Sequence, residues 1–581
     1  AGGSLEYNGT ASVLSVTVDE GASLSGTGLY SLNTITDEEQ GVSVGGTFTN
    51  NGTYSPGSGL AAGDGADAIA SVSIDGNYEQ GETGTLVLSF DEEAATDVLT
   101  ISGKATLAGT VAFAAVRDYY ADGTITLALA DMVSAEELAV SESLALDLLD
   151  VSPTLDMTLA SGTAADGADS SYTISAARSA SAYSRYAASG QQAELAGNLD
   201  EIGQTDLTAA AGDLGDAREL LTALDFSASD GSDLPGAYEE LGPDAFTKAA
   251  QASLSLQRSL SAQIVNGRLL ASASGSNAGQ AQAMAAGDEE GSAGSMRVFA
   301  TPMGGRNVSF SGGGADTSYY GLLAGAETDI ALGRDSLTLG VHAAFLHTEG
   351  SANDNDKAKG DNISLGLHGR WDPDLSLDAG SLGSVSPYVM GLVRGGLETR
   401  HMEREVSFNG YNRKAESDWS APTFSALLGT GLDVRPCDAI VFGPVLWLDW
   451  TAMWRPSVEE DGGLAADLEL DAATYQSLRS SLGARVNVRL HDGPDAARLA
   501  GSLNLSLTAV WNHEFLYDNG ATTARFAHFG STSFTDRADV SDRDTFGGML
   551  QLTGHLTDNV SLSLFGGLEQ GPKTSDAHGG A

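Results

Sequence analysis

The chain has 581 residues, which exceeds one ordinary domain, and two or three domains are expected. Its net charge of −49 argues against nucleic-acid binding, because phosphate backbones are bound through basic surfaces. Cys437 is the single cysteine, so neither an intrachain disulfide nor a cysteine-based metal site can form. The 73 glycines are typical of a glycine-rich β protein, and no run of about 18 apolar residues is present to form a transmembrane helix.

The two parts of the chain on either side of residue 295 differ in composition. Residues 1–295 contain 42 acidic and 8 basic side chains, whereas residues 296–581 contain 36 and 21. All six tryptophans and all nine histidines follow residue 295. These differences predict a domain boundary there. The first residues, AGGSLEYNGT, do not form a signal peptide, and we expect the chain to be a fragment of a longer protein.

Short strands separated by turns are predicted for residues 1–172. Apolar and small polar residues alternate in runs such as 14–18, 72–74 and 86–90, and Gly, Asn and Asp separate the runs. Leu86, Leu88 and Phe90 share one face of their strand, and we expect that face to line a core.

Residues 173–235 are rich in Ala, Ser and Gln. Leu195, Leu199 and Ile202 recur at helical spacing, and glycines interrupt the pattern. This predicts short, loosely packed helices.

The longest helix is predicted at residues 241–270. Pro243 suits a first helical turn, and Asp244 adds negative charge at the positive end of the helix dipole. Charged and amide side chains are spread along the helix, so it cannot face lipid and suits a polar or water-filled enclosure. A solvated helix between two domains is the alternative. The side chains expected to mark the enclosed helix are Phe246, Lys248, Arg258, Ile264, Asn266 and Arg268. After it, residues 271–294 are rich in Ser, Gly and Ala and predict a flexible tether.

Longer alternating segments follow residue 296. In residues 482–490, Leu and Val alternate with Arg and Asn, and residues 363–371 alternate in the same way with Ser, His and Arg. An apolar face opposite Arg, Asn and His is typical of a membrane barrel with a polar lumen, although a soluble sandwich can show the same alternation in one strand. Eleven such segments favour the barrel. Tryptophans near the strand ends are expected to form interfacial girdles: Trp419, Trp447, Trp450, Trp454 and Trp511.

Three blocks in the first part, GTFTNNGTYSPG, IDGNYEQGETGTLVLSF and DVLTISGKATLAGTV, resemble the C-terminal end of autotransporter passengers. LGPDAFTKAAQASLSLQRSLSAQIVNGRL resembles the linker helix of that family, and MRVFATPMGGR, YYGLLAGAETDI, LTLGVHAAFLHTEG and NISLGLHGRWDP resemble the start of its translocator domain. The resemblance covers about nine tenths of the chain. It departs at the end, where the family has a twelfth strand with a terminal aromatic residue and this chain has SDAHGGA.

The resemblance implies an all-β protein with a central helical linker. Its expected parts are a right-handed parallel β-helix end at residues 1–172, a short-helix junction at 173–235, a helical linker and tether at 236–294, and a 12-stranded transmembrane β-barrel at 295–581 with the helix in its lumen. Only eleven strands are found in the sequence, so the last strand is expected to be truncated and the barrel to assemble poorly, because open strand edges are not tolerated in lipid.

No catalytic constellation, cofactor site or metal site is predicted, and the chain is not expected to be an enzyme. Gly41-Val-Ser-Val-Gly45 matches the G-x-S-x-G pattern, but a strand precedes it, no helix follows, and every histidine lies beyond residue 340. The run 353–356, Asn-Asp-Asn-Asp, lacks the glycine and glutamate of an EF-hand loop and predicts a solvated surface loop. The resemblance includes members that cut themselves between two asparagines in the barrel, but the Asn50-Asn51 pair lies in the first part of this chain.

The leading hypothesis is therefore an outer-membrane autotransporter unit that exports and displays its own passenger, with residues 1–235 at the cell surface or released by cleavage. Its expected partners are outer-membrane lipid and, from the resemblance, the barrel-assembly machinery and periplasmic chaperones; the barrel is expected to be monomeric. Two alternatives remain: a surface adhesin or hydrolase whose active part lies upstream of residue 1, and a soluble all-β binding protein.

Overall fold

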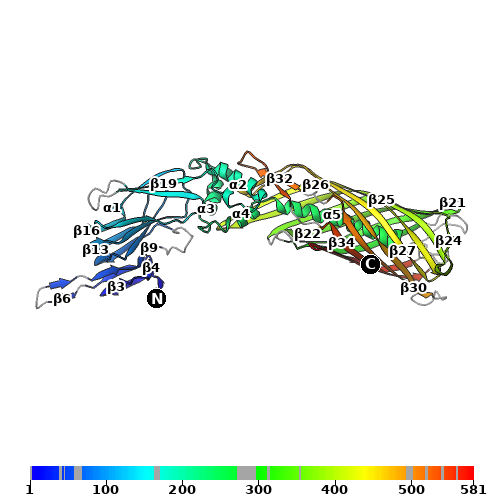
Figure 1. The fold of residues 1–581 in the computed structure, drawn as a ribbon, viewed down its shortest axis with the longest axis horizontal. Helices are drawn as coiled ribbons and strands as arrows, with labels where there is room; N and C mark the ends of the chain where they lie inside the picture. Colours follow the sequence, from blue (N-terminus) through cyan, green and yellow to red (C-terminus); the bar gives the residue numbers. More distant parts are fainter. Residues whose placement is uncertain are drawn as a thin grey trace.

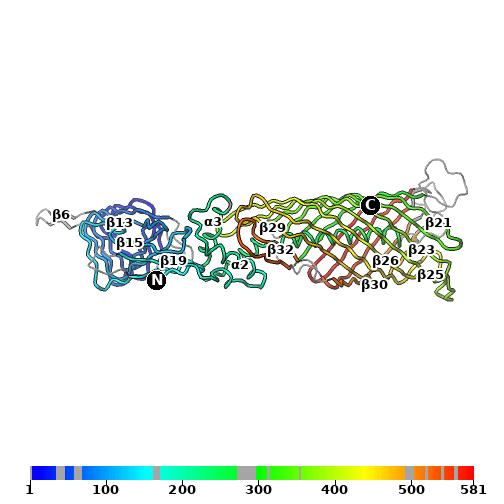
Figure 2. Tube along the Cα trace, turned by 90° about the horizontal axis from the view of Figure 1, so that it is seen from above, coloured from blue at the N-terminus to red at the C-terminus, as the bar shows by residue number. Residues whose placement is uncertain are grey.

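The protein is elongated, with a β-helical part, a group of short helices and a long barrel arranged in chain order (Figures 1 and 2). The computed structural model describes residues 3–33, 35–37, 42–44, 46–57, 68–161, 171–270, 296–310, 314–352, 355–492, 502–516, 521–537, 542–557 and 560–581. The expected tether at 271–294 lies outside the described residues. Within the described residues, no helix combines the length and the apolar character needed to cross a membrane.

Two parallel sheets form the β-helical part. One has the order β1-β4-β9-β12-β14-β17 and the other β2-β5-β10-β13-β11-β8-β3, with β16 paired to β13. Their strands are short because turns recur every few residues, as the Gly, Asn and Asp spacing predicts. The bounds are β1 Ser4–Glu6, β2 Thr10–Val13, β3 Ser15–Val18, β4 Ser23–Gly26, β5 Leu29–Leu32, β8 Thr47–Asn50, β9 Thr53–Pro56, β10 Ser71–Asp75, β11 Asn77–Gln80, β12 Thr85–Phe90, β13 Val98–Leu107, β14 Thr110–Ala115, β16 Val133–Val140 and β17 Ala145–Leu148. A separate antiparallel pair is formed by β6 (Ile35–Asp37) and β7 (Val42–Val44).

The β-helical part ends in a different kind of sheet. β15 (Gly123–Ala128) and β18 (Leu155–Ser161) both pair antiparallel with β19 (Ser171–Arg178). This sheet adds Ile125, Leu127 and Ile174 to the same hydrophobic core as the parallel strands. It extends across the expected boundary at residue 172, and a one-turn helix, α1 (Leu129–Met132), precedes β16.

The short helices are well packed, so the expectation of loose packing is wrong. They are α2 (Gly190–Gly203), α3 (Asp213–Asp225) and α4 (Leu234–Glu240), preceded by the 3-10 turn η2 (Ser184–Tyr186). Ser189 caps α2 by accepting a hydrogen bond from the Gln192 amide. Leucines of α2 and α3 form one core with side chains from barrel extensions near residues 402–421 and 458–534. This long-range core gives packing that local composition does not reveal.

Twelve antiparallel strands close the barrel, not the eleven found in the sequence. They follow the order β23-β22-β21-β20-β36-β35-β34-β31-β30-β27-β26-β25, and β23 pairs with β25 to complete the ring. The twelfth strand is β36 (Thr574–Gly580), which pairs with both β20 and β35. The expected open edge is therefore closed. The other bounds are β20 Met296–Ser309, β21 Ala315–Leu332, β22 Asp335–Ala352, β23 Asp356–Asp372, β25 Ser384–Phe408, β26 Tyr411–Cys437, β27 Ile440–Arg455, β30 Ala473–Asp492, β31 Ser502–Glu514, β34 Asp544–Thr557 and β35 Val560–Gln570.

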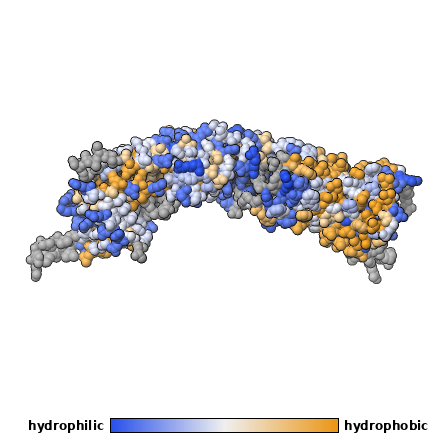
Figure 3. Space-filling view, in the orientation of Figure 1, coloured by the Kyte–Doolittle hydropathy of each residue, from blue (hydrophilic) through white to orange (hydrophobic). Residues whose placement is uncertain are grey.

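Burial in the barrel is opposite to that of a soluble protein. Leu365 and Leu428 are 67% exposed, whereas Arg370, Arg394 and Arg404 are among the largest fully buried side chains. Hydrophobic residues gather on the outer surface of the barrel at the end away from the short helices (Figure 3). This pattern places lipid outside and polar groups inside, and it disfavours the soluble alternative.

The tryptophans only partly follow the expected girdles. Trp454 and Trp511 are exposed, but Trp419 and Trp447 point inward and are buried. The strand positions of these two indoles place them on the inward face, where Trp419 contacts Phe246 at a ring-centroid distance of 5.5 Å.

Several barrel strands continue beyond the barrel toward the short helices. β25 and β26 form a long hairpin that turns at Asn409 and Gly410, both of which have positive φ. Beside it lies a small sheet of order β28-β29-β32-β33. We call the hairpin end at 402–420, this sheet and its connecting residues the collar. Its remaining elements are β28 Val458–Glu459, η6 Leu464–Ala466, β29 Leu468–Leu470, β32 Ala521–Phe526 and β33 Phe534–Arg537. The hairpin of β24 (Leu377–Asp378) and the turn η5 (Gly380–Leu382) lie at the opposite end.

Candidate functional site

The candidate site is the barrel lumen and the helix inside it. Helix α5 (Asp244–Ile264) begins at the collar and enters the barrel (Figure 1), and one π-helical turn, η3 (Val265–Leu269), continues it. Pro243 lies at the N-cap position, directly before the first helical residue. Nearly all α5 side chains are buried, although many are polar. The lumen therefore has to supply partners for these polar groups.

Two arginines hold the C-terminal end of the helix. Arg370 Nη1 donates to the Leu269 carbonyl at 3.0 Å, and Arg485 donates to the Leu270 carbonyl. Asp433 contacts both guanidinium groups, with its Oδ2 at 2.9 Å from Arg370 Nη2. Positive side chains at the negative end of a helix dipole satisfy carbonyls that the helix itself leaves unpaired.

A second charged group lies near the same end of the helix. Arg268 Nε donates to Glu327 Oε1 at 2.7 Å, and its guanidinium lies 4.3 Å from the centroid of the Phe299 ring. His368 Nε2 is 2.9 Å from Glu327, and His368 in turn contacts His342 at 3.0 Å. Glu327 thus joins the helix to strands β21 and β23.

The middle of α5 contacts β25 on one side. Arg394 Nη2 donates to the Gln257 carbonyl at 2.7 Å and to the Gln257 side chain at 3.1 Å. One turn earlier, Arg400 Nη2 donates to Ser253 Oγ at 2.8 Å, and Ser253 also contacts Glu398. These bonds connect one face of the helix to the longest hairpin of the barrel.

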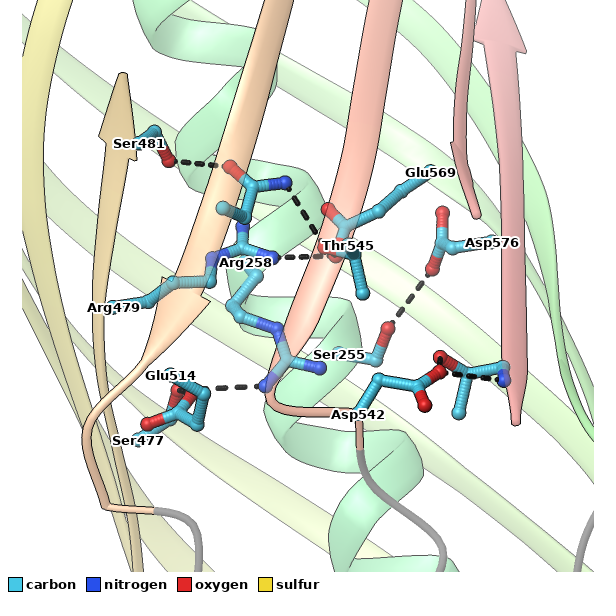
Figure 4. A network of polar contacts seen from close by, with 12 residues as sticks. Ser255, Arg258, Ser477, Arg479, Ser481, Glu514, Asp542, Thr545, Glu569 and Asp576 are labelled. Carbon is cyan, nitrogen blue, oxygen red and sulfur yellow. Dashed lines mark hydrogen bonds and ion pairs between the residues drawn. The ribbon is translucent and has the colours of Figure 1, made fainter. Parts of the chain in front are cut away.

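The opposite face of α5 meets the last strand and a polar cavity (Figure 4). Ser255 Oγ donates to Asp576 Oδ2 at 2.9 Å, and Ser259 also contacts Asp576. Arg258 projects toward Ser477 and Glu514 in a cavity of about 60 Å³, where Arg479 pairs with Glu569 at 2.6 Å. This volume holds a few water molecules, since one needs roughly 10–15 Å³.

The helix also has an apolar contact surface that the sequence pattern did not predict. Leu256, Leu260, Ile264, Val265 and Leu269 form a core with inward-facing barrel side chains. The barrel residues in this core include Leu323, Tyr388, Met390, Leu392 and Trp447. The alternation along the strands assigns these barrel residues to the inward face, but their apolar character suggested that they face lipid. The enclosure is thus part polar and part apolar.

The other expected site residues occupy defined positions. Phe246 is buried in the core shared by the short helices and the collar, above the lumen. Lys248 is buried and pairs with Asp244 at 2.9 Å, and Asn266 donates to the Ala262 carbonyl at 2.9 Å. In the β-helical part, Leu86, Leu88 and Phe90 are each 0% exposed and oppose Val111, Phe113 and Ala115 of β14.

The collar binds the short helices through charged and amide groups. Asp216 of α3 accepts from Tyr411 Oη at 2.8 Å and from Arg413 Nε at 3.0 Å. Asn409 at the hairpin turn donates to the Ala223 and Phe226 carbonyls at 2.6 and 2.7 Å. On the other side, Asn198 of α2 accepts from Thr532. Sequence reasoning missed these contacts because each joins residues far apart in the chain.

The described residues show no arrangement suited to metal chemistry, because no group of three or more His, Cys, Asp or Glu side chains there could hold a metal ion. Gly41, Gly45, Asn353 and Asp354 lie outside the described residues, so the G-x-S-x-G and Asn/Asp runs are only partly described. Arginine, serine and carboxylate groups around an enclosed helix bind and orient that helix.

The barrel matches a known family of protein domains. The family model described as "Autotransporter beta-domain" matches residues 298–566. No curated relative matches the chain. Among solved structures, the translocator domain of autotransporter NalP from Neisseria meningitidis is 14% identical, with a TM-score of 0.39, over 58% of this chain and 96% of that one. The transport unit of the autotransporter AIDA-I from Escherichia coli is also similar, with 14% identity and a TM-score of 0.33 over 51% of this chain and 91% of that one. The beta domain of the Bordetella autotransporter BrkA is 14% identical, with a TM-score of 0.35, over 50% of this chain and 98% of that one. On the family match, residues 298–566 are an autotransporter β-domain, which forms an outer-membrane translocation unit.

Proposed function

We propose that the barrel exports residues 1–235 to the cell surface and then holds them there, with α5 remaining in the lumen as a plug. In this proposal, residues 1–172 are the passenger end, 173–235 a junction, 236–294 the linker and tether, and 295–581 the translocator. The observation that carries the proposal is the position of α5, which connects the β-helical part to the barrel through the lumen.

The width of the lumen supports export of an unfolded chain. One helix, about 10–12 Å across with its side chains, contacts the barrel wall on opposite faces. A β-helix built from two sheets cannot pass through this space. The passenger therefore crosses extended and folds outside, where stacking of Leu86, Leu88 and Phe90 on β14 opposes return.

The loop lengths support the orientation. Barrels of this kind have short periplasmic turns and longer extracellular loops. The two longest connections between consecutive barrel strands, 455–473 and 514–544, contain most of the collar, whereas 332–335 and 437–440 are short turns at the other end. The collar and the passenger thus belong on the cell surface.

The contacts between α3 and the collar favour a passenger held in a fixed position on the barrel over one that is attached only by a flexible tether. Asp216, Asn409 and Arg413 form buried or half-buried bonds across this interface, next to a shared apolar core. Residues 1–235 then act as a folded stalk without catalysis of their own. Insertion into lipid would use the barrel-assembly machinery and periplasmic chaperones, and the barrel would work as a monomer.

Labelling of cysteines with a membrane-impermeant maleimide tests the proposal. Cys437 is exposed at the end of β26, next to the short turn to β27, and Lys104, whose side chain is 67% exposed, lies on β13. In intact cells we expect labelling of the Lys104→Cys/Cys437→Ser variant but not of the wild-type chain. Permeabilising the outer membrane should then expose Cys437. Labelling of Cys437 but not of residue 104 in intact cells would reverse the orientation and refute surface display.

A further inference from the structure

The first and last strands of the barrel meet along a short seam. β20 pairs with β21 along residues 296–309, but with β36 only along residues 303–309. β36 has 7 residues, and β35 likewise contacts it only through residues 565–570. Fewer backbone hydrogen bonds therefore hold β36 to either of its neighbours than hold β20 to β21.

The side chains of β36 make little apolar contact with lipid at the seam. The outward-facing positions of β36, which include Ala577, carry small residues, and the sequence of the strand, TSDAHGG, contains no large apolar side chain. Burial of apolar surface in lipid, which anchors the other strands, contributes little here. The inward position Asp576 is buried instead, and a buried carboxylate requires hydrogen-bond donors.

Helix α5 supplies donors to this carboxylate, and it contacts the first strand as well. Ser255 Oγ donates to Asp576 Oδ2 at 2.9 Å, and Ser259 Oγ is 3.3 Å from the same oxygen. Asn307 of β20 donates to Ser255 Oγ at 3.0 Å and is 3.5 Å from Asp576. Ser255 thus bonds simultaneously to the first and the last strand (Figure 4 shows its bond to Asp576).

We propose that α5 latches the barrel seam from inside, with Ser255 and Ser259 as the residues that position Asp576 against Asn307. Hydrogen bonds to a charged acceptor are stronger than neutral ones, and a low-dielectric lumen favours them further. Arrival of the helix in the lumen then completes closure of the barrel, in addition to blocking its channel. This role does not require surface display, so it can be tested on the isolated protein in detergent.

Hydrogen–deuterium exchange of the full chain in detergent measures the latch. The Ser255→Ala/Ser259→Ala variant should exchange the amides of residues 303–309 and 574–580 at least about tenfold faster than wild type, with β27 and β30 unchanged. The matched control is Ser253→Ala/Ser261→Ala, which removes two buried hydroxyls of the same helix that contact Arg400 and Arg394 of β25. The control should leave exchange at the seam within about twofold of wild type.

A second experiment joins the two strands of the seam by a disulfide bond. Arg306 and Ala577 are opposed in the register and both exposed, so a disulfide between Arg306→Cys and Ala577→Cys, with Cys437→Ser, joins the two strands outside the lumen. This bond should restore slow exchange, or folding if the serine variant does not fold. Unchanged seam exchange in Ser255→Ala/Ser259→Ala, equal acceleration in the control, or failure of the disulfide to rescue would each overturn the latch.

Discussion

At the scale of single residues, buried polar groups have different roles in the two parts of the chain. In the β-helical part, Asn50 and Gln80 donate to backbone carbonyls between successive turns, such as Thr85 at 3.0 Å and Thr110 at 2.8 Å. In the lumen, Arg370 and Arg485 donate to the end of a helix. Asn50 and Gln80 thus stabilise the stacking of successive turns, whereas Arg370 and Arg485 bind the C-terminal end of α5 and its π-helical turn.

The core of the β-helical part should not tolerate a charge at Leu88. This side chain is fully buried opposite Phe113, so Leu88→Asp buries an unpaired carboxylate at a cost of several kcal/mol. We expect the passenger part to become protease-sensitive at the surface or to stall during export. Leu5→Asp, at a position that is 60% exposed, is the control and should remain resistant. Wild-type resistance of Leu88→Asp would show that this stretch is not a folding core.

Asp97 should make the β-helical part less stable as pH rises. Burial raises the pKa of its carboxyl group to about 6, although the Ala70 and Ser89 amides donate to it at 2.7 Å and act in the opposite direction. Between about pH 4 and 6 the folded state retains a proton that the unfolded state releases, so the free energy of unfolding falls with rising pH.

The loss should be on the order of 3 kcal/mol between pH 4 and 7. Pulse proteolysis of the full chain in urea measures it. Asp97→Asn should be less stable overall, because its amide cannot accept both backbone bonds, but its stability should not change over this pH range. An equal slope in both proteins would assign the pH dependence to another group.

At the scale of elements, α5 depends on its enclosure for stability. Its apolar stripe, Leu256, Leu260 and Ile264, packs against the barrel wall. On its polar faces, bonds to β25, β36 and the arginines at its end replace solvent. The helix then changes to π geometry at 265–269, where Gly267 lies closest to the Gln263 side chain. A Cβ at this glycine would come within 3.0 Å of Gln263.

The plug can be tested by conductance and by labelling. Removing residues 243–270 should raise ion conductance across a planar bilayer, because the lumen loses both its charged and its apolar contacts. In detergent, Gln257→Cys/Cys437→Ser should resist a maleimide until the barrel is unfolded, because Gln257 is 1% exposed behind Arg394. The exposed Cys437 of the wild-type chain should react at once. Equal conductance with and without the helix, together with rapid labelling at 257, would place the helix outside.

The sequence predicted eleven barrel strands and the enclosed helix, because alternation and scattered charge are local signals. It did not predict β36, since TSDAHGG has no apolar face to alternate. It also missed the inward Tyr388, Met390 and Trp447, whose apolar character suggests lipid. The collar core joins residues near 195–224 to residues near 402–534, and such long-range packing has no signature in a single sequence.

At the scale of the whole molecule, one buried hub connects the β-helical part to the short helices, and these connect to the barrel. Asp225 of α3 pairs with Arg178 of β19 and accepts from Tyr183 Oη at 2.7 Å, with both charged side chains at most 1% exposed. Two residues before Asp225, the Ala223 carbonyl accepts a hydrogen bond from the Asn409 side chain of the collar. The orientation of the stalk therefore depends on α3.

Breaking this hub should loosen the stalk and leave the barrel intact. Asp225→Ala leaves the Arg178 guanidinium buried without its counter-ion, which costs about 3–5 kcal/mol. We expect protease to cut within residues 179–233 and release the β-helical part, while the barrel still migrates differently before and after boiling in a detergent gel. Lys104→Ala, which removes a solvent-exposed ion pair with Glu137, is the control and should resist cleavage like wild type. If Asp225→Ala also abolished the heat-dependent change in migration, the stalk and the barrel would form a single cooperative unit; if it resisted protease, the hub would not hold the stalk.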